Sequence, residues 1–170
     1  EGFARFTYPA SIQTLQSATV QILHRLNKET LDMQTVTNTS PANCTVNFEF
    51  GIADADTFNF LDEEELKKIQ KTLKQQPLSV LDVYCVARYH TRQDDGKHKP
   101  LKFDYDMLRF AFGRKNMELF VYHERGTQRI PLEDLVIFIR DQVNEQLVQK
   151  GQQTLTLKKV IKSQTMFSLQ

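Results

Sequence analysis

Alternating apolar and polar residues between positions 81 and 124 predict three antiparallel strands. The alternating segments are residues 81–92, 101–112 and 117–124, and short turns separate them. The first turn contains Asp95-Gly96, a dipeptide typical of tight hairpins. Residues 131–148 then place apolar side chains at steps of three and four, the spacing of an amphipathic helix. This pattern predicts a three-stranded meander closed by a helix.

The second of these predicted strands changes its apolar phase partway along. Odd positions are apolar from Leu101 to Met107, and even positions are apolar from Leu108 to Phe112. A strand keeps one phase unless an extra residue is inserted, so we expect a β-bulge near Met107 and Leu108. The alternative is that both faces of the second half of this strand are covered.

The first half of the chain predicts two helices and a hairpin. Residues 9–27 carry one apolar stripe at helical spacing, and residues 45–51 and 57–60 read as two short strands. Asp62 followed by Glu65 has the spacing of a helix N-cap, and Pro77 ends that helix. Residues 28–44 are polar and predict a loop, with a short strand at residues 33–37 as the alternative.

These elements predict an α+β fold with a single antiparallel sheet. We expect about five strands, the hairpin plus the three-strand meander, with helices mainly on one face. Residues 1–150 are expected to form one domain, and residues 151–170 a short amphipathic C-terminal tail. The pattern leaves open whether the second face of the sheet is covered. Five residues are predicted to be in the core: Val83, Cys85, Val121, Leu135 and Ile139.

Charge is unevenly distributed along the 170 residues. The formal net charge is +1, but residues 1–65 are mainly acidic and residues 66–170 mainly basic. One interpretation is that a basic face meets an anionic partner. The other is that folding mixes the charges of the two halves. We favour the second interpretation, because position in the sequence does not place a charge in the folded protein.

The sequence contains no glycine-rich phosphate loop, no Cys-x-x-Cys pair and no nucleophile motif. No cofactor and no metal are therefore expected. His90 and His98 flank two aspartates in the first turn, but their spacing matches no standard metal site. No apolar run is long enough to cross a bilayer, so no membrane association is expected. Asn38 and Asn43 begin glycosylation sequons, which are inert in the intracellular, cytoplasmic setting that we expect.

Three functions are compatible with these features. We rank a non-enzymatic protein-interaction or assembly module first, as a homo-oligomer or with a protein partner, since enzymatic motifs are absent. Its candidate interface residues are Phe110, Phe112, Phe120, Val160, Ile161 and Phe167. The second is single-stranded nucleic-acid binding, in which basic residues contact phosphates and aromatic rings stack on bases. Its candidate residues are Arg88, Arg92, Lys97, Lys99, Lys102, Tyr84 and Tyr122.

The third function is a hydrolase-type enzyme. Asp104, Asp106, Glu118 and Glu124 are expected on one sheet face beside Arg88 and His90. Carboxylates next to a histidine suit acid–base catalysis when they lie in a cleft and their pKa values are shifted. On an exposed antiparallel sheet the same residues are more often ordinary cross-strand pairs, so this hypothesis ranks last and no catalytic residue is assigned.

Overall fold

A computed structural model describes residues 1–54 and 56–162 of the chain. Three α-helices and a nine-stranded sheet make up this part. The elements are, in chain order, β1 (Gly2–Thr7), α1 (Ile12–Leu26), β2 (Thr30–Asp32), a 3-10 turn (Met33–Thr35), β3 (Cys44–Asp54), β4 (Thr57–Phe60), α2 (Glu63–Gln75), β5 (Val80–Arg92), β6 (His98–Pro100), β7 (Asp104–Phe112), β8 (Asn116–Arg125), α3 (Leu132–Gln149) and β9 (Thr156–Lys162).

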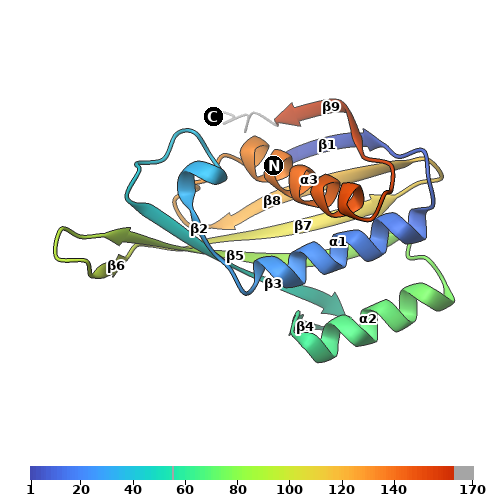
Figure 1. Ribbon diagram of the computed structural model, residues 1–170, viewed down its shortest axis with the longest axis horizontal. Coiled ribbons are helices and arrows are strands. Elements are labelled where there is room, and N and C mark those ends of the chain that lie inside the picture. The colour runs from blue at the N-terminus through green and yellow to red at the C-terminus, as the bar shows by residue number, and fades with distance from the viewer. Residues whose placement is uncertain (55, 163–170) are drawn as a thin grey trace, which may run out of the picture.

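The sheet is antiparallel and has the strand order β2-β3-β5-β7-β8-β1-β9, with β4 beside β3 and β6 beside β5 (Figure 1). This confirms the predicted α+β class with an antiparallel sheet, but the expected count of about five strands is too low. Strands β2 and β6 have three residues each, too few to show alternation. Strands β1 and β9 lack a regular alternation as well. Strand β1 carries apolar side chains on both faces, and the register of β9 shifts where it pairs with β1.

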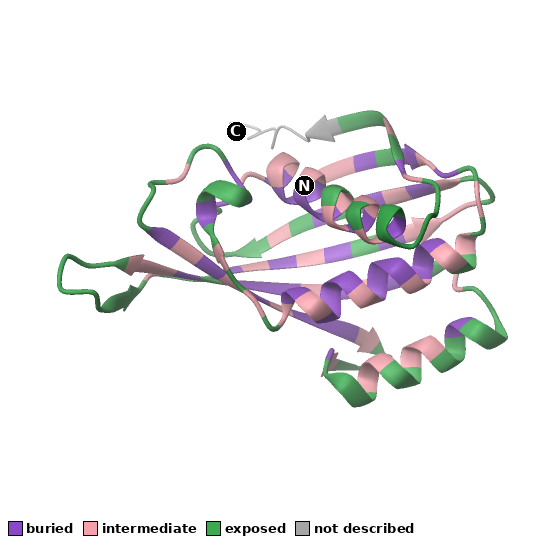
Figure 2. Ribbon diagram, in the orientation of Figure 1, coloured by how far each residue is buried: buried purple, intermediate pink, exposed green. Residues whose placement is uncertain are grey.

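Helices α1 and α3 lie on one face of the sheet, and α2 runs beside α1 (Figure 1). The purple bands of Figure 2 mark where the strands and helices bury side chains against one another. All five predicted core residues lie there, each at most 1% exposed: Val83, Cys85, Val121, Leu135 and Ile139. The start of α2 is also confirmed, because the Asp62 carboxylate accepts a hydrogen bond from the Glu65 N–H at 2.9 Å.

The bulge predicted in β7 near Met107 and Leu108 is not found there. The strand begins at Asp104 and pairs with β5 without a register shift up to Ala111. The irregularity lies instead in its pairing with β8, between Tyr105 and Asp106. Even residues of β7 therefore point towards the helices throughout, and the odd residues Tyr105 and Met107 are half-buried on the other face.

Two other segments differ from the sequence prediction. The alternative strand at residues 33–37 is wrong, since Met33–Thr35 is a 3-10 turn and the short strand precedes it at Thr30–Asp32. Residues 156–162, expected in the tail, form β9 and pair with β1. Within the described part of the chain, every helix is too short or too polar to span a membrane.

Candidate functional site

The sheet face turned away from α1 and α3, which we call the outer face, carries the most prominent surface of the protein. In the described residues, no helix packs against it. Large apolar side chains are nevertheless exposed there. Tyr122 is 51% exposed, Phe58 is 49% exposed and Phe120 is 41% exposed. Clustered exposed aromatic side chains are characteristic of interaction surfaces rather than of ordinary solvated sheet faces.

Strand pairing arranges the outer side chains in two neighbouring rows that cross the sheet. The first row contains Phe3, Phe120, Arg109 and Asp82, and the second contains Tyr122, Met107, Tyr84 and Gly51. Six of these residues, all but Tyr84 and Gly51, line a groove of about 740 Å³, which we call the outer groove. Its main lining side chains are Phe3, Phe58, Met107, Arg109, Phe120 and Tyr122.

Aromatic contacts hold the floor of the outer groove in place. The rings of Phe3 and Phe120 lie 4.9 Å apart, and Phe58 meets Tyr84 edge-on at 5.0 Å. The Tyr84 ring lies over Gly51, where a Cβ atom would overlap it. Gly51 therefore leaves room for the Tyr84 ring, and the groove-lining Phe58 packs against that ring.

Three arginines that point to this face are each paired with a carboxylate on the same face. Arg109 donates two hydrogen bonds to Asp82, at 2.7 and 2.9 Å. Arg88 donates to Glu49 at 2.7 Å, and Arg5 lies 3.6 Å from Glu118. These three cations are consequently paired within the protein, and the lining of the outer groove is mainly apolar.

The residues predicted to bind nucleic acid are only partly brought together. Tyr84 and Tyr122 share the outer face with Arg88, as that hypothesis requires, but Arg88 is held by Glu49 and lies over the Phe103 ring at 5.6 Å. The other basic residues lie along or just after the hairpin of β5 and β6, which projects beyond the sheet (Figure 1): Arg92, Lys97, Lys99 and Lys102. They are therefore separated from the aromatic rows.

The residues predicted to form an interface are also divided. Phe120 and Val160 are exposed, whereas Phe110 is buried in the core and Phe112 is half-buried beside it, with the two rings 6.4 Å apart. The Phe110 position differs from the expectation because even residues of β7 face the helices. Ile161 belongs to β9, but its side chain lies outside the described residues, as does Phe167.

Sequence reasoning missed Phe3, Phe58 and Met107 as parts of the outer groove. A signal for Met107 was present, because Tyr105 and Met107 are apolar on the phase opposite to Leu108 and Phe110. Apolar residues on both phases of one strand indicate an apolar surface on both faces of the sheet. No such signal was available for Phe3, whose position depends on the pairing of β1 with β8.

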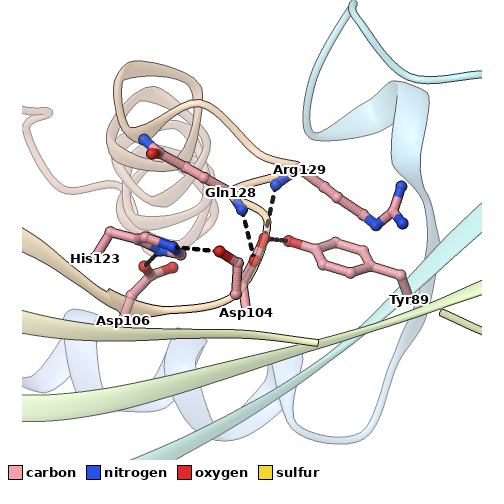
Figure 3. Close-up of polar contacts among 7 residues, drawn as sticks. Tyr89, Asp104, Asp106, His123, Gln128 and Arg129 are labelled. Atoms are coloured by element: carbon pink, nitrogen blue, oxygen red, sulfur yellow. Dashed lines mark hydrogen bonds and ion pairs between the residues drawn. The ribbon is translucent and has the colours of Figure 1, made fainter. Parts of the chain in front are cut away.

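A second notable feature is a buried carboxylate at the start of β7 (Figure 3). Asp104 is 1% exposed, and its carboxylate accepts hydrogen bonds from the Tyr89 hydroxyl at 2.6 Å and from the backbone N–H groups of Gln128 and Arg129 at 2.7 Å each. Gln128 has a positive φ of 54°. Asp104 thus holds the loop between β8 and α3 against the sheet.

Asp106 and His123 form a hydrogen-bonded pair next to Asp104 (Figure 3). The His123 Nδ1 atom lies 2.8 Å from Asp106, and its Nε2 atom lies 3.2 Å from the carbonyl oxygen of Gly126. Burial lowers the pKa of His123, but these two hydrogen bonds and the charges of Asp106 and Asp104 raise it by more, so it lies above its ordinary value. An imidazolium ring donates to both acceptors.

The prediction that the carboxylates of β7 and β8 share one sheet face is wrong. Asp104 and Asp106 point towards the helices and are buried, because even residues of β7 face inwards. Glu118 and Glu124 lie on the outer phase of β8. Both oxygens of Asp104 and both ring nitrogens of His123 are already engaged by the protein. Among the described residues, no group of three His, Cys, Asp or Glu side chains is placed to share a metal ion.

The His123 pair predicts a pH dependence of stability. A raised pKa in the folded state means that the folded protein holds this proton more tightly than the unfolded chain. The stabilisation is complete below the ordinary histidine value of 6.5 and is lost as pH rises through the folded pKa. Urea unfolding at a series of pH values is expected to show this decline above pH 6.5 in the natural protein and not in His123→Gln. Parallel curves for the two proteins would contradict it.

Comparison with protein-family models, with curated proteins and with solved structures finds no significant match to this chain. The function is therefore inferred from the geometry of the outer face and of the buried cluster.

Proposed function

We propose that this protein is a non-enzymatic interaction or assembly module that binds a protein surface through the outer groove. The observation that supports this proposal is an apolar groove on a sheet face over which no described helix packs. A sheet with apolar side chains on both faces is stabilised by a layer on each side. Here α1 and α3 supply one layer, and a partner would supply the second.

The composition of the outer groove favours a protein partner. Aromatic residues, methionine and arginine are the residue types most enriched in the centres of protein interfaces, and they make up its main lining. The arginine that lines it, Arg109, is paired with Asp82, so this cation is already engaged within the groove. The buried cluster offers no competing catalytic site, because Asp104 is closed off by three donors from the protein.

Single-stranded nucleic acid is the second candidate partner. It is favoured by one observation, the position of Tyr84 and Tyr122 on a face against which no described helix packs, where the exposed Tyr122 ring is accessible to a base. It is disfavoured by the pairing of Arg88 and by the distribution of the lysines on the hairpin. Retardation of a single-stranded oligonucleotide at low salt that is lost in Tyr122→Ala would rank this candidate first.

Photo-cross-linking from two positions tests the proposal. A benzophenone amino acid replaces either Tyr122 on the outer groove or Val148, which is 63% exposed on α3 and serves as the matched control. Irradiation in cells of the native source is expected to yield protein adducts from position 122 and not from position 148. The substitution Phe120→Glu in the same chain is expected to reduce the adducts about tenfold or more, as loss of an interface anchor does.

Equal adducts from positions 122 and 148 would contradict the proposal, because they would indicate random collisions. An absence of adducts from position 122 would contradict it too. Thermal unfolding of each variant serves as the folding control, since Phe120 and Tyr122 are both exposed and their replacement is expected to leave the core intact.

A further inference from the structure

We infer that the partner of the outer groove is a second copy of this chain. In this arrangement two sheets pack face to face about a two-fold axis that lies in the interface along the groove, between its two rows. The inference rests on the proposed function. Its basis is that the two rows of one face are complementary to each other at their positions on β7 and β8.

A two-fold axis between the rows brings the first row of one copy against the second row of the other. On β8, Phe120 then meets the second copy's Tyr122, and this aromatic contact occurs twice. On β7, the stem of Arg109 meets Met107. The two rows therefore offer compatible side chains at their positions on β7 and β8.

Charge also favours a second copy over a charged partner. The Arg109–Asp82 pair lies within the rows, the Arg5–Glu118 pair lies on one side of them and the Arg88–Glu49 pair on the other. Because each of these three pairs is neutral, the pairs add no net charge where two identical faces meet. A strongly acidic or basic surface would find these six charges already paired.

The size of the face is sufficient for a stable pair. The five strands from β3 to β1 are spaced about 4.8 Å apart and share roughly seven paired residues of about 3.3 Å each, which gives roughly 550 Å² in flat projection. A standard-size interface buries about 800 Å² of accessible surface on each partner, and accessible surface exceeds flat projection. The face formed by these five strands is therefore large enough for an interface of standard size.

A charge-swap experiment tests the inference. Sedimentation velocity over a concentration series is expected to show dimers for the natural protein and for Val148→Glu, the control on α3. Phe120→Lys and Tyr122→Glu are each expected to raise the dimer dissociation constant about 30-fold or more, as the loss of an interface anchor does. An equimolar mixture of these two variants is expected to regain dimers, because Lys at position 120 of one chain then faces Glu at position 122 of the other.

The outcomes separate this inference from the proposed function. A natural protein that is monomeric at every concentration overturns the inference, as does a mixture that stays monomeric while each variant remains folded. If position 122 still cross-links to a different protein in that case, the proposed function stands and only the identity of the partner was wrong. If position 122 gives no adduct at all, both fail.

Discussion

Replacing Asp104 with alanine is expected to lower the free energy of unfolding by about 3–5 kcal/mol, since each of the donors left unpaired in a buried site costs about 1–3 kcal/mol. Three donors converge on this carboxylate: the Tyr89 hydroxyl and the backbone N–H groups of Gln128 and Arg129. The backbone donors belong to the loop that leads into α3, so the loss also releases the start of that helix. Urea denaturation of Asp104→Ala and the natural protein measures the difference.

A matched variant isolates one of the three bonds. Tyr89→Phe removes the hydroxyl donor alone and leaves both backbone donors bound to Asp104, so it is expected to cost about 0.5–3 kcal/mol. The two substitutions therefore differ mainly in whether the loop is held. A cost of less than 1 kcal/mol for Asp104→Ala would mean that water replaces the carboxylate, and it would contradict a structural role for this residue.

Replacing Leu135 with alanine is expected to cost about 2–5 kcal/mol, because the substitution leaves a cavity in a packed core. Leu135 is 1% exposed on the face of α3 that packs against the sheet. The control on the same helix is Val148→Ala, where the side chain is 63% exposed, and it is expected to change stability by less than about 0.5 kcal/mol. Similar losses for the two variants would show that α3 packs through a different face.

Local patterns were sufficient for the parts of the fold that depend on neighbouring residues. Strand β5 alternates from Val80 to Cys85, so the burial of Val83 and Cys85 followed from the period of a strand. The start of α2 followed from Asp62 and Glu65, because a helix cap is formed by residues three positions apart. The core face of α3 followed from its helical spacing in the same way.

The outer groove depended on contacts that no local pattern records. Phe3 and Phe120 become neighbours only because β1 pairs with β8, more than a hundred residues away. The strand order β8-β1-β9 places the first and the last described strands side by side at one edge of the sheet, and β9 does not alternate because its register shifts opposite Arg5 and Phe6. The position of a bulge and the pairing partner of a strand depend on the whole sheet, so a pattern of a few residues does not predict them.

The sequence by itself determined the α+β class, the antiparallel meander and the core faces of β5 and α3, because these follow from periods of two and 3.6 residues. Only the tertiary structure decided that Asp104 is a buried acceptor rather than a surface acid. A carboxylate is buried where donors converge on it, and two of the three donors here belong to a loop 24 and 25 residues further along the chain. Their convergence is a property of the folded chain, and the same holds for the two rows of the outer groove.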